Sequence, residues 1–310
     1  MRTYLLLLLL CACSYTTFSQ KIETVYRNTK DSTADMYIAV KPESGTIDAC
    51  MFLLDGFGNS PSGLLMQTDL PQYAAKKNIL TIVPLLKTGR LYFGSDSASQ
   101  ASLKEMVEMI YSKYAIQGKP FYIGGLSIGG TCAVKYAELA IQKNYPVKPA
   151  ALFAVDPPLD WERFYTSAKR IVRLSKTDQI NPEVTYMIDR IEKEMHGTPE
   201  TALENYYNNS PYSFSDTTQR AIKPLVKLPV MLIAEPDIQW WLANRGYDYS
   251  YMNVADHAAM INELKRLGND KAILVTTTNK GYRKFDNTRH PHSWSIADPE
   301  KTIGWLLEQK

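Results

Sequence analysis

Short apolar runs alternate with longer segments of helical periodicity along most of the chain. The clearest of these runs is ACMFLL at 49–54, and an unbroken apolar stretch of this length suits a buried strand covered on both faces. We expect strands at residues 23–28, 36–40, 49–54, 79–84, 121–123, 151–155, 230–234 and 272–276. Apolar residues three and four positions apart predict helices at 62–77, 101–114, 131–142, 255–267 and 299–309. This alternation, with short connections, indicates an α/β fold whose mostly parallel central sheet has helices on both faces.

The alternation stops between residues 157 and 227. Residues 160–176 place apolar side chains on one helical face, and Asn181-Pro182 predicts the start of a second helix that ends at Gly197. We expect this insertion to form a helical cap over a site, with an ordinary packing insertion as the alternative. The predicted organisation is a signal peptide at 1–19, a core at 20–156 and 228–310, and a cap at 157–227.

The first twenty residues have the character of an export signal. Arg2 is followed by the apolar stretch Leu5–Cys13, which is too short for a membrane span of about 20 residues. Small residues before Gln20 suit a signal peptidase, which predicts a secreted or periplasmic bacterial protein. The segment LCAC at 10–13 also resembles a lipobox, so a lipid anchor on Cys13 is the alternative. No other stretch reaches spanning length.

The amino-acid composition excludes several classes of protein. The chain has 310 residues, of which 45% are apolar and 22% charged, with a net charge of +3 and no long basic run. These values exclude disorder and a polytopic membrane protein, and they argue against a nucleic-acid partner. Only Cys50 and Cys132 would remain after the leader is removed. We expect two buried free thiols, with one disulfide as the alternative, and no zinc site.

The sequence GLSIG at 125–129 lies between a predicted strand and a predicted helix. This G-x-S-x-G motif has a mechanical meaning in that setting, because the sharp turn lifts the serine hydroxyl clear of the sheet. Glycines suit the flanking positions, where strand and helix backbones come close. We therefore predict Ser127 as a nucleophile; a glycine-rich turn with an inert serine is the alternative.

A serine nucleophile needs a base, and the base needs a group that orients it. Two histidines, His290 and His292, lie in the loop before the last helix, and we expect His292 to be the base. Asp237, just after the strand 230–234, is the expected acid, because in this motif's usual chain order the acid follows a late strand. Asp156 is the rival acid, although a carboxylate before two prolines is also typical of a turn.

Taken together, the early strands and the segments LLDGFG, IGGLSIGG, LIAEPD and HPHSW follow the order of the α/β-hydrolase fold. The resemblance covers residues 23–309 and is closest to secreted bacterial esterases of the feruloyl-esterase and dienelactone-hydrolase type. It implies hydrolysis through an acyl-enzyme without a cofactor. Asp55 departs from the pattern, since many members have a histidine there, and the cap matches no known substrate-specific cap.

The residues around the motif also predict an oxyanion hole and substrate-binding groups. We expect the hole to be formed by the backbone N–H groups of Ile128 and Phe57, with Gly56 as the alternative to Phe57. Gly56, Trp240 and Trp241 are the expected substrate-binding residues, since the aromatic rings between 206 and 251 suit a sugar or an aryl acyl group. Packing of the cap is the alternative role for these rings.

The sequence therefore predicts a secreted serine hydrolase, most simply a carboxylesterase acting on a small-molecule or carbohydrate-linked ester. Two alternatives stay open. One is a serine peptidase of the same fold that acts on small peptides, which would use the same residues. The other is a non-catalytic carbohydrate- or peptide-binding protein that retains the fold.

Overall fold

A computed structural model describes residues 21–28, 30–176 and 180–309. The predicted leader, with Cys11 and Cys13, lies outside these residues. Within the described ranges, no helix combines the length and the apolar character needed to cross a membrane.

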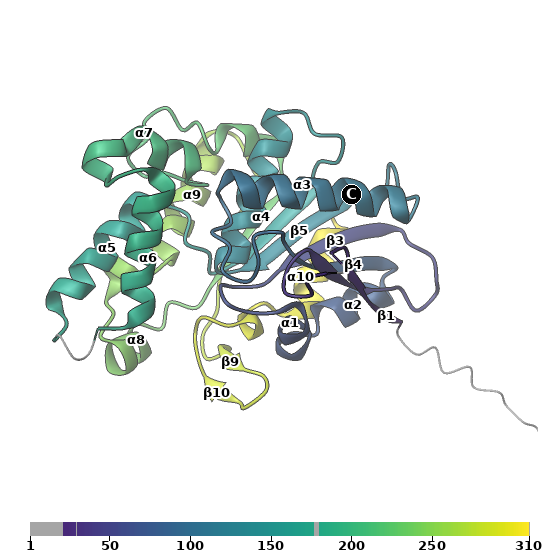
Figure 1. The fold of residues 1–310 in the computed structure, drawn as a ribbon, viewed down its shortest axis with the longest axis horizontal. Coiled ribbons are helices and arrows are strands. Elements are labelled where there is room, and N and C mark those ends of the chain that lie inside the picture. The colour runs from purple at the N-terminus through teal and green to yellow at the C-terminus, as the bar shows by residue number, and fades with distance from the viewer. Residues whose placement is uncertain (1–20, 29, 177–179, 310) are drawn as a thin grey trace, which may run out of the picture.

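An eight-stranded sheet forms the centre of the protein, in the order β1-β2-β4-β3-β5-β6-β7-β8 (Figure 1). In this sheet β2 pairs antiparallel with both β1 and β4, and all the other neighbouring strands pair in parallel. The strands are β1 (Ile22–Tyr26), β2 (Met36–Val40), β3 (Ala49–Leu54), β4 (Ile79–Leu85), β5 (Phe121–Leu126), β6 (Ala151–Val155), β7 (Val230–Ala234) and β8 (Ala272–Thr276). The predicted fold class, a mostly parallel sheet between helices, is confirmed.

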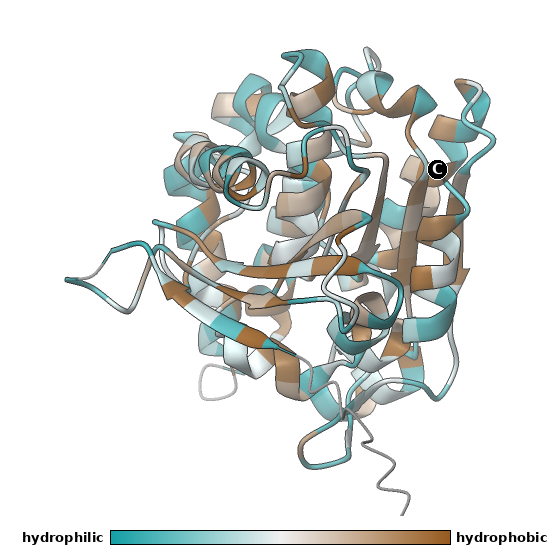
Figure 2. Ribbon diagram, turned by 90° about the vertical axis from the view of Figure 1, so that its right-hand side faces the viewer, coloured by the Kyte–Doolittle hydropathy of each residue, from teal (hydrophilic) through white to brown (hydrophobic). Residues whose placement is uncertain are grey.

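Helices cover both faces of the sheet because alternate residues of the buried strands point to opposite sides. In β3, Phe52 packs in one core with residues of α3 (Ser97–Lys113), α4 (Ile128–Gln142) and α9 (Val254–Arg266). Met51 and Leu53 face the other core, with residues of α1 (Pro61–Gln67), α2 (Leu70–Lys76) and α10 (Pro299–Leu307). Figure 2 shows the hydrophobic colouring concentrated along the strands and on the inner sides of the helices.

The single helix expected at 62–77 is two helices, α1 and α2, separated at Thr68 and Asp69. Pro71 lacks the N–H that would bond to the Gln67 carbonyl in a continuous helix, so it suits the first turn of α2 instead. The Thr68 hydroxyl accepts a hydrogen bond from the Leu70 N–H at the break, at 3.2 Å.

Between β6 and β7, the described residues form α5 (Trp161–Leu174), α6 (Pro182–Met195), α7 (Pro199–Asn209) and the short 3₁₀ helix η1 (Lys223–Lys227). Two further elements follow β7, namely α8 (Ile238–Arg245) and η2 (Tyr249–Tyr251). Figure 1 shows α5, α6, α7 and α8 gathered on one side of the molecule, away from the strand β1. A small hairpin of β9 (Tyr282–Arg283) and β10 (Thr288–Arg289), then η3 (Trp294–Ile296), precede α10. The sequence patterns did not predict α7, α8 or the hairpin.

Candidate active site

Ser127 lies on a strained turn between β5 and α4. Its φ of 53° and ψ of −126° are rare for a residue with a side chain, and such strain often marks a functional position. Its N–H donates to the Val155 carbonyl at 2.9 Å, which fixes the turn against the end of β6.

The flanking glycines are required by close backbone approach. A Cβ at Gly125 would overlap the backbone of Gly129, and a Cβ at Gly129 would overlap the Leu54 carbonyl and lie 2.6 Å from that of Asp55. The turn therefore packs directly on the residues that end β3.

His292 is paired with Asp156. Its Nδ1 lies 2.6 Å from Asp156 Oδ2, and because a carboxylate only accepts hydrogen bonds, the Nδ1–H is the donor and Nε2 is left as the basic nitrogen. Burial by itself lowers the pKa of His292, but the hydrogen bond and the charge of Asp156 outweigh it and raise this pKa above the usual 6.5. The pKa of Asp156 moves the other way: burial raises it, and the larger combined effect of His292 and nearby positive charge leaves it lowered.

Asp237, the acid that the sequence favoured, does not contact His292 in the structure. It is the N-cap of α8, where Oδ1 accepts from the Trp240 N–H at 3.0 Å, and its Oδ2 pairs with Arg289 at 2.6 Å. The expectation was wrong about which strand end supplies the partner of His292. Both β6 and β7 end at the same edge of the sheet, and the pattern of the chain does not reveal which carboxylate turns toward the imidazole.

His290 has a different environment from its neighbour. Its Nδ1 lies 2.8 Å from the His292 carbonyl oxygen, and its ring packs edge-on against Trp240 and Trp241. Burial, then the charge of His292, lowers the pKa of His290 to about 4, so the ring is neutral near pH 7. The structure therefore brings His292, rather than His290, to the carboxylate of Asp156.

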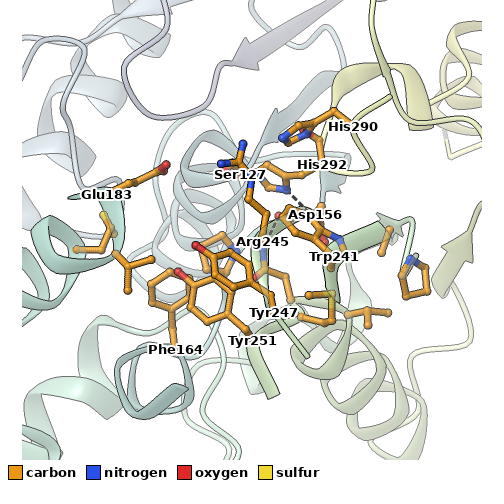
Figure 3. A pocket seen from close by; sticks show the side chains of 18 of the residues that line it. Ser127, Asp156, Phe164, Glu183, Trp241, Arg245, Tyr247, Tyr251, His290 and His292 are labelled. Atoms are coloured by element: carbon orange, nitrogen blue, oxygen red, sulfur yellow. Dashed lines mark hydrogen bonds and ion pairs between the residues drawn. The ribbon is translucent and has the colours of Figure 1, made fainter. Parts of the chain in front are cut away.

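A cavity of about 260 Å³ brings Ser127, Asp156, His290 and His292 together (Figure 3). Its other walls combine apolar and polar side chains and come from the loop after β3, from α5 and α6, and from the segment between β7 and α9. These lining residues include Phe57, Phe164, Val184, Met187, Trp241, Tyr247, Tyr251 and Met252. Glu183, Glu235 and Arg245 are the ionisable side chains among the other lining residues.

Phe57 and Ile128, the expected oxyanion donors, both line this cavity. Ile128 is the first residue of α4, so its N–H has no partner within the helix. The Phe57 N–H donates no hydrogen bond to any described part of the chain. Gly56 lies against the turn, where a Cβ would be 3.5 Å from Ser127 Cβ.

The two expected tryptophans differ in position. Trp241 lines the cavity and stacks on Tyr247 with ring centres 5.8 Å apart. Trp240 does not line it; it packs edge-on against Trp241 at 4.9 Å and so supports the wall from behind. The sequence flagged Tyr247 and Tyr251 as aromatic candidates but missed Arg245, because a lone arginine at a helix end has no distinguishing signal.

The remaining candidates fill structural roles. Cys50 and Cys132 are free and buried, as expected. His257 is fully buried, with Nε2 2.8 Å from the Pro157 carbonyl oxygen. The described ranges contain no cluster of metal-ligating side chains.

The pairing of His292 predicts a measurable change in its pKa. Asp156→Asn removes the carboxylate that is the main cause of this raised pKa, so only the smaller effect of Glu183 opposes burial and the value should fall below 6.5. Asp237→Asn should leave it unchanged, since Asp237 does not touch the ring. Titration of ¹³C-labelled histidine by NMR measures the pKa of His292 in wild type and in both variants. An equal response in the two variants would contradict the pairing.

Comparison with solved structures identifies the fold. No family model and no curated protein sequence matches the chain. Among solved structures, an esterase/lipase from an uncultured bacterium is 12% identical, with a TM-score of 0.58 over 93% of this chain and 85% of that one. The fluorophosphonate-binding serine hydrolase FphF of Staphylococcus aureus is 14% identical, with a TM-score of 0.55 over 93% and 98%. An S-formylglutathione hydrolase from Agrobacterium tumefaciens is 11% identical, with a TM-score of 0.56 over 95% and 97%. The chain therefore has the α/β-hydrolase fold.

Proposed function

We propose that this protein is a serine hydrolase that cleaves carboxylic esters through an acyl-enzyme. The observation that carries the proposal is the meeting of two features in one cavity. One is the strained turn that presents Ser127, and the other is the hydrogen bond of 2.6 Å between His292 Nδ1 and Asp156. The esterases and serine hydrolases that share the fold support it.

In the proposed reaction, Ser127 Oγ attacks the ester carbonyl while His292 Nε2 accepts the hydroxyl proton. Asp156 holds the ring through Nδ1–H and stabilises the imidazolium that forms. His292 then protonates the departing alcohol, which leaves the acyl group bound to Ser127. A water molecule, deprotonated by His292, attacks this acyl ester and releases the acid and the free serine.

The negative charge that develops on the carbonyl oxygen needs donors fixed in place beforehand. We assign this role to the N–H groups of Ile128 and Phe57, on either side of Ser127. Ile128 also benefits from its place at the N-terminus of α4, where the helix dipole favours negative charge.

The aromatic part of the lining suits an apolar acyl or alcohol group, while Glu183, Glu235 and Arg245 leave other parts of the wall charged. Aromatic rings contribute much of that lining, and Phe164, Tyr247 and Tyr251 pack on one another with ring centres 5.2 Å and 4.6 Å apart. A small-molecule ester is the substrate class that suits these walls.

A substrate panel and an active-site probe test the proposal. A fluorophosphonate should label Ser127, and the protein should hydrolyse p-nitrophenyl esters faster than aminoacyl anilides. Ser127→Ala should abolish labelling and lower kcat by several orders of magnitude, because the attacking oxygen is gone, while the thermal midpoint stays close to wild type. Faster cleavage of anilides would favour a peptidase, and labelling at another serine would contradict the assignment.

The acid has its own test. Asp156→Asn should lower kcat/KM by on the order of 10⁴-fold, by analogy with other triads, whereas Asp237→Asn should stay within a few-fold of wild type. Because His292 must be neutral to accept a proton, wild-type kcat/KM should fall as the pH drops through a value above 6.5. In Asp156→Asn this acid limb should move to lower pH. A crippled Asp237→Asn with an active Asp156→Asn would reverse the assignment.

We also propose that the protein is exported, on the strength of Arg2 and the apolar stretch Leu5–Cys13. Mass spectrometry of the mature N-terminus after expression in a bacterial host should find Gln20. A lipid-modified Cys13 would show an anchored protein instead, and an unprocessed Met1 would contradict export.

A further inference from the structure

We propose that Asp55 is a positioning residue that holds the oxyanion loop and the histidine loop at a fixed separation. The oxyanion loop is residues 55–58, directly after β3, and the histidine loop is residues 290–294. This inference rests on the proposed function, because it concerns the groups that would stabilise the oxyanion and accept the serine proton.

One carboxylate oxygen joins the two loops. Asp55 Oδ1 accepts the Gly56 N–H at 2.8 Å and the Trp294 indole Nε1–H at 2.9 Å. Asp55 and Trp294 are 239 residues apart in the chain. Asp55 is 8% exposed and Trp294 only 1%, so water does not compete for either hydrogen bond. The buried carboxylate therefore fixes the distance between the start of one loop and the end of the other.

The backbone of Asp55 is held as well. Its carbonyl oxygen accepts the Tyr92 hydroxyl at 2.5 Å and packs against Gly129, just after the nucleophile turn. The main chain of Asp55 is held against the nucleophile turn, and its side chain is bonded to Trp294. Asp55 therefore has little conformational freedom. Asp55, which fixes the position of the oxyanion loop, therefore also resists movement of the histidine loop.

The groups at stake are close by in the chain. Phe57, the expected oxyanion donor, is two residues after Asp55, and His292 is two residues before Trp294. Loss of one oxyanion donor costs about 10²–10³ in kcat, and a displacement of about 1 Å can cost on the order of 10². A carboxylate that sets both groups therefore affects the transition state without touching the substrate.

Nothing in this role requires the charge of the carboxylate. Burial raises the pKa of Asp55, although the hydrogen bonds from Trp294 and Gly56 oppose it. Both groups that it binds are neutral N–H donors, which an amide oxygen can also accept. Asparagine should therefore replace aspartate here, while alanine should not.

The experiment compares kcat and KM for a p-nitrophenyl ester in wild type, Asp55→Ala, Asp55→Asn, Trp294→Phe and the double variant Asp55→Ala/Trp294→Phe. Active sites are counted with a fluorophosphonate, and thermal midpoints are recorded. Two control variants remove the same kinds of buried group, a carboxylate and an indole N–H, at other places in the protein. Asp216→Ala removes a 5%-exposed carboxylate that accepts from Thr218 and Arg220, and Trp161→Phe removes a buried indole N–H that donates to Ser95 Oγ at 2.9 Å.

We expect Asp55→Ala to lower kcat by about 10- to 100-fold with KM within about threefold of wild type, and Asp55→Asn to keep most of the activity. Trp294→Phe should lower kcat by less than Asp55→Ala, because only the link between the loops is lost. The double variant should be no slower than Asp55→Ala alone, since both changes break the same connection. The controls should lower the thermal midpoint while kcat stays near wild type.

Several results would overturn the inference. The first is a kcat near wild type in Asp55→Ala. The second is a loss of kcat in the double variant that equals the product of the two single losses. The third is a loss of kcat in Asp216→Ala or Trp161→Phe as large as that in Asp55→Ala or Trp294→Phe, respectively. If Asp55→Ala does not fold, Trp294→Phe measured against Trp161→Phe decides, and equal kcat values overturn the role. In each case turnover by wild type and its loss in Ser127→Ala leave the proposed function intact. Absence of wild-type turnover would instead overturn that function together with the positioning role.

Discussion

The close backbone approach at Gly125 and Gly129 is the constraint on which the rest of the site depends. Because no Cβ fits at either glycine, the end of β5, the start of α4 and the end of β3 pack on one another directly. This contact forces Ser127 into a positive φ and raises it at the edge of the sheet. It also brings Gly56 and Phe57 beside the nucleophile, so one packing requirement places both the proposed attacking group and a proposed oxyanion donor.

A second constraint acts between strands. Parallel strands end at one edge, so the loops after β3, β5, β6 and β7 converge there whatever their order in the chain. The two candidate acids, Asp156 and Asp237, both follow strands that end at this edge, and they differ in their hydrogen-bond partners. Asp156 meets the imidazole of His292, whereas Asp237 caps α8 and pairs with Arg289. The surroundings of each carboxylate, rather than its residue type, decide what it does.

The cavity depends on pieces that are distant in the chain. Phe164 and Met187 come from the insertion after β6, while Trp241, Tyr247 and Tyr251 come from the segment after β7. The two segments are held together by hydrogen bonds such as that from Asn181 Nδ2 to the Tyr247 hydroxyl, at 3.2 Å. The walls around the site are thus a joint product of the predicted insertion and a stretch that the sequence assigned to the core.

The sequence by itself determined the strands, the α/β class, and the local setting of Ser127. These features depend on side-chain periodicity and on glycines at fixed spacing, which are local properties. Only the tertiary structure decided that Asp156 rather than Asp237 binds His292, and that Asp55 binds Trp294. Each of these pairs joins residues more than 130 positions apart. Their contact depends on the twist of the sheet and on which way each loop turns, and neither is encoded in the pattern around any one residue.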